Sequence, residues 1–97
     1  MATYLMLFRF TGRGIENIKD SPARIEAAKK AFQAIGAHVK DFYLLMGSYD
    51  TAFIVEAPDD ETIMKASLNL GSQGSVRTET IRAFTEDEYK RIIADLS

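Results

Sequence analysis

The stretch TYLMLFRF, residues 3–10, is the most informative part of the chain, because both of its alternating faces are apolar. Successive side chains of a β-strand point to opposite faces, so the aromatic and methionine residues lie on one face and Leu5 and Leu7 on the other. Residues 51–57 (TAFIVEA) have the same character. Strands that are apolar on both faces belong in the middle of a sheet that is covered on both sides.

The rest of the chain supplies elements that pack around these two strands. Residues 21–35 carry apolar side chains at helical spacing and predict a helix that Ser21 caps. The glycines at 12 and 14 predict a turn, because the third glycine of a dinucleotide-binding loop is missing. We also predict a short helical turn at 15–19, a strand at 39–46, a tight turn at 47–50 and a strand at 75–84. A further helix begins within residues 58–61 and ends within residues 71–74, and a C-terminal helix begins at a capping box formed by residues 85–88.

This order, β-α-β-β-α-β with a terminal helix, predicts an α+β ferredoxin-like antiparallel sheet in one domain over residues 1–97. Two helices cover one face of such a sheet. The other face needs a cover too, because Phe8, Met6, Tyr4 or their neighbours otherwise form an exposed apolar patch. We expect a second copy of the sheet to cover it in a two-fold dimer. The alternative is a monomer in which the C-terminal helix folds across that face.

Composition excludes several classes of function. Among 97 residues, 12 Lys and Arg stand against 14 Asp and Glu, a net charge of −2 that argues against nucleic-acid binding through phosphates. No cysteine is present, which excludes disulfides, thiolate metal sites and a cysteine nucleophile. The single histidine, His38, is interpreted as a surface residue, and strand alternation places it on the face opposite Asp41. We therefore expect neither a metal site nor a cofactor.

The chain shows no sign of membrane insertion. Its apolar start is short and lacks a basic leader and a cleavage site. No stretch approaches the roughly 20 apolar residues that a transmembrane helix needs. We expect a cytoplasmic protein with no membrane partner.

Polar residues gather at the hairpin turn and on the last strand. Tyr49, Asp50 and Arg77 could hold a small ligand if they lie at the rim of a cavity between two sheets. The plain alternative is that Asp50 closes a turn and Arg77 belongs to a solvated edge strand. RNA-recognition domains share this element order, but Asp50 and the negative net charge argue against RNA binding.

Six short motifs stand out along the chain: residues 17–22 (NIKDSP), 42–43 (FY), 47–50 (GSYD), 56–60 (EAPDD), 76–80 (VRTET) and 83–85 (AFT). Together they resemble the GYD domain family, a small, mostly bacterial family of uncharacterised function. The resemblance covers practically the whole chain and implies a ferredoxin-like fold with kinship to dimeric α/β-barrel proteins. Some of those relatives are cofactor-free oxygenases, isomerases or haem-handling enzymes, and others sense ligands.

Three hypotheses follow for the function. The first is a homodimeric module that binds a small organic molecule without chemistry of its own. The second is a cofactor-independent enzyme, an oxygenase or isomerase, acting on a small carbonyl or aromatic substrate. In this enzyme Tyr43 or Tyr49 donates a hydrogen bond, Asp50 is the general base and Arg77 binds the charge of the substrate. The hypothesis requires Asp50 to lie beside a tyrosine in an enclosed cavity. The third is a purely structural oligomer.

Overall fold

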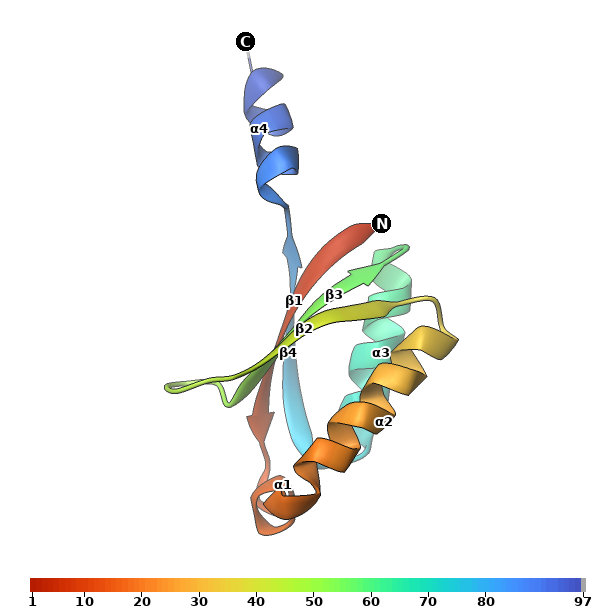
Figure 1. Cartoon of the computed structure of the whole chain (residues 1–97), viewed down its shortest axis with the longest axis vertical. Helices are drawn as coiled ribbons and strands as arrows, with labels where there is room; N and C mark the ends of the chain where they lie inside the picture. The colour runs from red at the N-terminus through yellow and green to blue at the C-terminus, as the bar shows by residue number, and fades with distance from the viewer. Residues whose placement is uncertain (97) are drawn as a thin grey trace.

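A computed structural model describes residues 1–96 and shows a four-stranded antiparallel sheet with two long helices on one face (Figure 1). The strands lie in the order β2-β3-β1-β4. Both strands with two apolar faces, β1 and β3, are central, which confirms the prediction from the sequence. The strands are β1 (Ala2–Phe10), β2 (His38–Leu44), β3 (Thr51–Ala57) and β4 (Val76–Ala83).

The helices occupy the predicted regions, with changes at their starts. The two long helices, α2 and α3, cover the sheet, and α3 begins after Asp59, whose side chain accepts a hydrogen bond from the Thr62 backbone N–H at 2.8 Å. No helix in the described part of the chain is long and apolar enough to span a membrane. The helices are α1 (Gly12–Glu16), the 3₁₀ turn η1 (Ile18–Asp20), α2 (Ser21–Ala34), α3 (Asp60–Ser72) and α4 (Glu86–Ala94).

Two predictions near the start of the chain were wrong. The predicted turn at residues 12–14 is the beginning of α1, because the Thr11 hydroxyl accepts a hydrogen bond from the Gly14 N–H at 3.1 Å and caps a helix there. Ser21 does not cap α2. It is the first helical residue, and Asp20 occupies the cap position with no hydrogen bond from its side chain.

The core lies between the sheet and helices α2 and α3. Tyr4, Met6 and Phe8 point from β1 toward the helices and are at most 4% exposed. Phe53 of β3 packs edge-on against Phe8 and against Phe32 of α2, with ring centroids 5.1 and 5.8 Å apart. Edge-to-face pairs of this kind add to the stabilisation that burial of the rings provides. The aromatic face of β1 is therefore the covered one.

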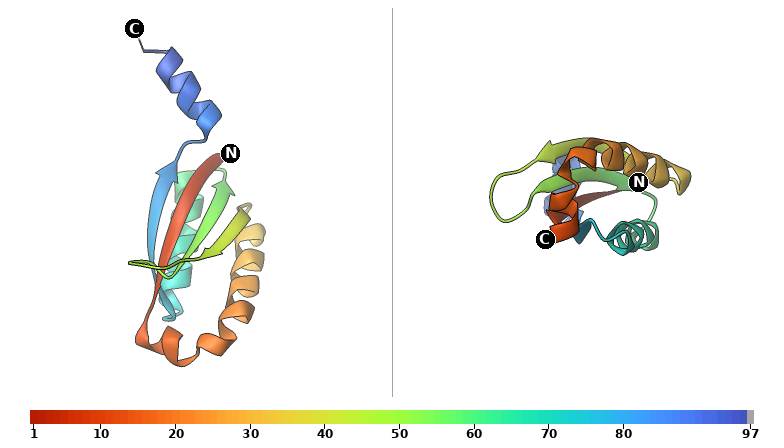
Figure 2. Two further views of the ribbon diagram at one scale, coloured as in Figure 1. Left: turned by 60° about the vertical axis from the view of Figure 1, so that its left-hand side comes forward. Right: turned by 90° about the horizontal axis from the view of Figure 1, so that it is seen from below.

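The opposite face of the sheet, which we call the open face, has no helix of the described chain over it. Figure 2 shows both long helices on the other side. The open face carries Leu5 and Leu7 of β1, Ile54 of β3 and Ile81 of β4, which are half-buried or exposed. The expected apolar patch is therefore not formed by Tyr4, Met6 and Phe8, which are buried under the helices. It is formed by their neighbours on the open face.

The C-terminal helix α4 does not fold across the open face. It continues beyond the end of β4 and points away from the sheet, which gives the molecule its longest dimension of 53 Å (Figures 1 and 2). Its apolar side chains stay exposed, and so does Leu96 just beyond its end: Tyr89, Ile92, Ile93 and Leu96 are between 46% and 70% accessible. A single chain therefore leaves two apolar surfaces without a partner.

An irregularity in β2 changes which residues share a face. The register between β2 and β3 shifts between Val39 and Asp41, so Lys40 is an extra residue in the strand. His38 pairs with Glu56 and Asp41 with Ile54, which puts both on the open face. The expectation that His38 and Asp41 lie on opposite faces was wrong, because strict alternation does not hold across a bulge.

Candidate functional site

The turn between β2 and β3 is fastened to the end of β1 by hydrogen bonds of Asp50. The Asp50 N–H donates to the Phe8 carbonyl, and its carbonyl accepts from the Leu45 N–H, each at 2.8 Å. Its carboxylate accepts from the Phe10 N–H, also at 2.8 Å. Gly47 has a φ of +107°, a conformation that residues with a side chain rarely adopt. The carboxylate of Asp50 is thus directed at backbone.

Tyr49 belongs to a cluster on the open face. Its hydroxyl donates to the Glu79 carboxylate, and the guanidinium of Arg9 lies 4.7 Å from the centre of its ring. Arg9 also donates from Nε to the Ser48 carbonyl at 2.8 Å. The hydrogen bond to Glu79, followed by burial and the negative charge of Glu79, raises the pKa of Tyr49 above its ordinary value.

Arg77 and Tyr43 lie on the same open face but at different distances from this cluster. Arg77 is directly opposite Arg9 on the neighbouring strand and is exposed, and within residues 1–96 it forms no ion pair. Tyr43 lies on the edge strand β2, where it pairs with Ala52 of β3, and is 54% exposed. The structure thus gathers Tyr49 and Arg77 near Arg9, whereas Tyr43 is two strands away from Arg9.

Arg9 is the residue of this cluster that the sequence interpretation missed. It is the only charged residue in the apolar stretch 3–10, and that isolation was the available signal. Arg9 and Arg77 place two positive charges side by side, which is unfavourable unless an anionic group lies nearby. Glu79 provides one such group.

The open face has opposite charges at its two ends. Arg9 and Arg77 mark the end next to α1. Glu56 and Asp41 lie toward the other end, beyond Leu7. Between these charges the surface is mainly apolar, with Glu79 opposite Leu7, so the face resembles an interface core with polar margins.

A separate cavity lies under the helices, on the other side of the sheet. The space that the centre of a water molecule can occupy has a volume of about 60 Å³, which is enough for several waters. At its rim Arg24 donates to the Asn17 carbonyl at 2.9 Å. The candidate residues Tyr43, Tyr49 and Arg77 do not line it. The lining residues are Phe8, Phe10, Ser21, Arg24, Ile25, Ala28, Phe42, Thr51, Phe53, Leu70, Gln73, Ser75 and Val76.

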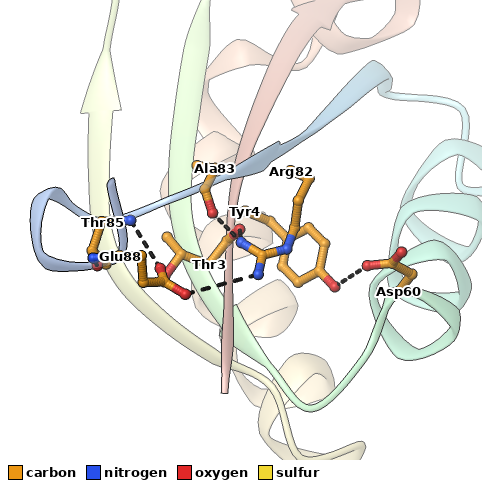
Figure 3. A network of polar contacts seen from close by, with 7 residues as sticks. All are labelled: Thr3, Tyr4, Asp60, Arg82, Ala83, Thr85 and Glu88. Atoms are coloured by element: carbon orange, nitrogen blue, oxygen red, sulfur yellow. Dashed lines mark hydrogen bonds and ion pairs between the residues drawn. The ribbon is translucent and has the colours of Figure 1, made fainter. Parts of the chain in front are cut away.

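A polar network joins the end of the sheet to α3 and α4 (Figure 3). The hydroxyl of buried Tyr4 donates to Asp60 at the start of α3. Burial, with this hydrogen bond second, raises the pKa of Tyr4 to about 12. The Arg82 guanidinium lies 5.6 Å from the Tyr4 ring centre and donates to the Thr3 carbonyl at 3.2 Å. Arg82 also reaches Glu88 of α4, at 4.0 Å.

Metal-binding side chains do not come together in the part of the chain that the structure describes. Within residues 1–96, no three of the His, Asp and Glu side chains are grouped so that they could hold an ion. Carboxylates with a lowered pKa have structural partners instead: the Thr62 hydroxyl and N–H lower the pKa of Asp59, and the Thr85 N–H lowers that of Glu88.

Comparison with known proteins finds relatives that extend over most of the chain. A protein described as "Glutamine synthetase and cystathionine beta-lyase binding protein" from Thermus thermophilus is 36% identical over 84 residues, covering 86% of this chain and 88% of the relative. The crystal structure of TTHA0845, also from Thermus thermophilus, is similar, with a TM-score of 0.57 and 28% identity over 88% of this chain and 95% of that one.

The sequence model described as the GYD domain matches residues 4–93. The match runs from β1 to α4 and includes the turn that Asp50 fastens. It agrees with the ferredoxin-like sheet and with the motifs identified in the sequence. This chain belongs to the GYD domain family.

Proposed function

We propose that this protein is a homodimeric binding module whose ligands are other proteins and which has no chemistry of its own. The observation that carries the proposal is the apolar surface that one chain leaves uncovered on the open face and on α4. Exposed apolar surface of this extent is typical of interaction sites. The Thermus thermophilus relative, named for binding two enzymes, supports a protein ligand.

The positions of the candidate residues favour binding over catalysis. A general base must reach the proton that it removes from a substrate. The carboxylate of Asp50 already accepts the Phe10 N–H, and the hydroxyl of Tyr49 donates to Glu79 rather than to Asp50. The requirement for an enzyme, Asp50 beside a tyrosine in a closed pocket, is therefore without support, and an oxygenase or isomerase is the weaker hypothesis.

The open face is the surface through which we expect two copies to associate. Its central residues are aliphatic, its margins are charged, and a two-fold axis allows the same patch to serve both subunits. A purely structural oligomer uses the same face but leaves no function for the exposed residues of α4.

The dimer is tested by sedimentation equilibrium with two matched variants. Ile81→Glu introduces a charge on the open face, and Met64→Glu introduces one on the outer surface of α3; the two native side chains are 41% and 47% exposed. We expect the wild type and Met64→Glu to sediment with twice the 10.8 kDa chain mass and Ile81→Glu to sediment as a monomer. A wild type of 10.8 kDa would refute the homodimer.

The protein ligand is tested with the glutamine synthetase and cystathionine β-lyase of the organism that encodes this chain. Each purified enzyme is passed over the immobilised protein, with an unrelated enzyme of similar charge as control. We expect saturable binding of at least one enzyme and none of the control. Absence of saturable binding to both enzymes would contradict the proposal for these partners.

A small organic ligand is the second candidate, and the cavity under the helices favours it. Its wall is mainly aromatic and aliphatic, with Arg24 and a few polar groups at the rim, the usual character of a small-molecule site. Its volume limits the ligand to a few non-hydrogen atoms. Short-chain carboxylic acids should raise the melting temperature of the wild type but not of Ala28→Leu, which fills the cavity. An equal shift in both would place the ligand elsewhere.

A further inference from the structure

We propose that α4 is a docking arm that packs on the α1 end of a second copy of this chain. The α1 end comprises residues 9–24, from Arg9 through α1 and η1 to the first turn of α2. This inference rests on the proposed homodimer and adds to it the contact that orients the two copies. Four observations support it: the fixed base of the arm, the uncovered apolar residues along one side of the arm, the charge of the arm, and the small size of the open face.

The base of the arm is held by a network that Figure 3 shows. Thr85 and Glu88 form a reciprocal capping box: the Thr85 N–H donates to the Glu88 carboxylate at 2.9 Å, and the Glu88 N–H donates to the Thr85 hydroxyl at 3.1 Å. The Arg82 guanidinium lies 4.4 Å from the ring centre of Phe84 and 4.0 Å from Glu88. The direction of α4 is therefore set before any partner arrives, which lowers the entropy cost of docking.

The arm presents apolar residues that its own chain does not cover. Tyr89, Ile92, Ile93 and Leu96 follow the i, i+3, i+4, i+7 pattern of a helix that lies on another surface. An isolated helix of nine residues is marginal in water, so α4 gains stability chiefly by packing. The stripe needs a partner.

The α1 end of the same chain is out of reach. It lies at the opposite end of the sheet from α4 (Figure 1). The eight residues of β4 alone span about 26 Å. Only two residues, Phe84 and Thr85, connect β4 to α4, and they extend over at most about 7 Å. Contact between the arm and an α1 end must therefore be between two copies.

The charges of the arm and of the α1 end are complementary. Residues 86–96 contain four acidic and two basic side chains, a net charge of −2. Residues 9–24 contain four basic and two acidic side chains, a net charge of +2. The α1 end also exposes Ile15 and Ile18, 55% and 41% accessible, which can meet the apolar stripe of the arm.

The charges of the open face require the same orientation. Stacking two open faces with their ends reversed brings Arg9 and Arg77 of each copy toward Glu56 and Asp41 of the other. Stacking them with like ends together places Arg9 and Arg77 of both copies opposite one another, offset only by one Glu79 from each copy, which is less favourable. The reversed arrangement, produced by a two-fold axis perpendicular to the strands, carries each arm beyond the shared sheet to the α1 end of the other copy.

The small size of the open face also supports a contribution of the arm to the dimer interface. Four strands of this length cover a footprint of about 450 Å². Stable dimers usually bury about 800 Å² of accessible surface on each partner. Side-chain relief makes the accessible area larger than the footprint, but the sheet remains a small interface. An arm about 14 Å long that is covered on its apolar side increases the buried area on both copies.

The contact is tested by paramagnetic broadening between copies. Because the chain has no cysteine, a spin label reacts only with an introduced one. A nitroxide is attached to unlabelled Lys90→Cys, and this protein is mixed with ¹⁵N-labelled wild type. Lys65→Cys is the control, because both lysines are exposed and each pairs with a glutamate four residues earlier. We expect the label at 90 to broaden amides of residues 12–20 in the other copy and the label at 65 to leave them sharp. Sharp resonances at 12–20 with both labels would refute the arm contact.

Association constants separate the arm from the homodimer. Ile92→Glu should raise the dimer dissociation constant at least tenfold, whereas Ile35→Glu, at a position of similar exposure at the end of α2, should leave it unchanged. Because α4 projects from the body, the effect of Ile92→Glu does not depend on the folding of the core. A wild-type monomer would refute the homodimer and the arm together. A stable dimer that Ile81→Glu dissociates and Ile92→Glu does not would refute the arm alone.

Discussion

Replacing Asp50 by alanine should lower the free energy of unfolding by about 2 kcal/mol. Asp50 is half-buried, and its carboxylate accepts the Phe10 N–H at 2.8 Å, far along the chain from its own turn. Hydrogen bonds to charged groups contribute about 1.5–3 kcal/mol, and the variant leaves the Phe10 N–H without its acceptor. Asp50→Asn keeps a neutral acceptor of the same shape, so its loss should be smaller, about 1 kcal/mol.

The assay is urea unfolding followed by circular dichroism at equal protein concentrations, because self-association makes stability depend on concentration. With a slope of about 1–2 kcal/mol per molar urea, Asp50→Ala should move the midpoint down by about 1–2 M. Asp20→Ala is the control, since the Asp20 side chain accepts no capping hydrogen bond, and it should stay within about 0.5 kcal/mol of the wild type. An Asp50→Ala variant as stable as the control, or an Asn variant less stable than the Ala variant, would refute the fastening role.

Two further predictions concern the ends of the sheet. The pKa of Tyr4 rises from 10.0 to about 12 on folding, so the stability that its protonated form contributes is complete below pH 10 and is lost as the pH rises to 12. Urea unfolding at pH 9 and 12 should show a loss of about 2 kcal/mol that Tyr4→Phe lacks; equal losses would exclude this cause. Gly14→Ala should cost more than about 2 kcal/mol, because its Cβ would lie 2.1 Å from the Ser75 carbonyl oxygen, whereas Gly12→Ala meets open space and should be neutral or stabilising. A thermal melt of the two variants compares them directly, and similar melting temperatures would contradict the steric argument.

The fold was predictable because the sequence states the environment of each strand in its apolar pattern. Residues 3–10 and 51–57 have two apolar faces and are central, while the polar stretch 76–83 lies at an edge. The capping box of Thr85 and Glu88 was also readable, because it needs only two residues at fixed spacing. Local chemistry and binary pattern agree in these segments, so they determine the structure.

The details that the sequence did not predict depend on contacts between distant residues. Alternation failed at β2 because one extra residue, Lys40, shifts the register. Asp50 has the composition of an ordinary turn residue, and only the folded chain shows that its carboxylate crosses to Phe10. Which face of β1 the helices cover was equally undetermined, since both faces are apolar and either can serve as core.

The candidate site was predicted in part, for the same reason. Simple strand alternation puts Arg77 and Glu79 on one face of β4, and the strand pairing agrees with it. The partners of Tyr49, however, come from β1 and β4, so no spacing in the sequence connects them. Arg9 became visible as part of the cluster only when the strands were placed side by side.

The separation of charge along the molecule makes its behaviour differ from that of an average chain with net charge −2. Residues 86–96 carry a net charge of −2 at one end of a 53 Å molecule, and residues 9–24 carry a net charge of +2 at the other. We therefore expect an electric dipole along its long axis. At a pH above its isoelectric point of about 5.3, where an evenly charged protein binds only anion exchangers, its basic end still offers a surface to a cation exchanger. Retention on both resins at low salt, lost as ions screen the two ends, is the expected chromatographic signature.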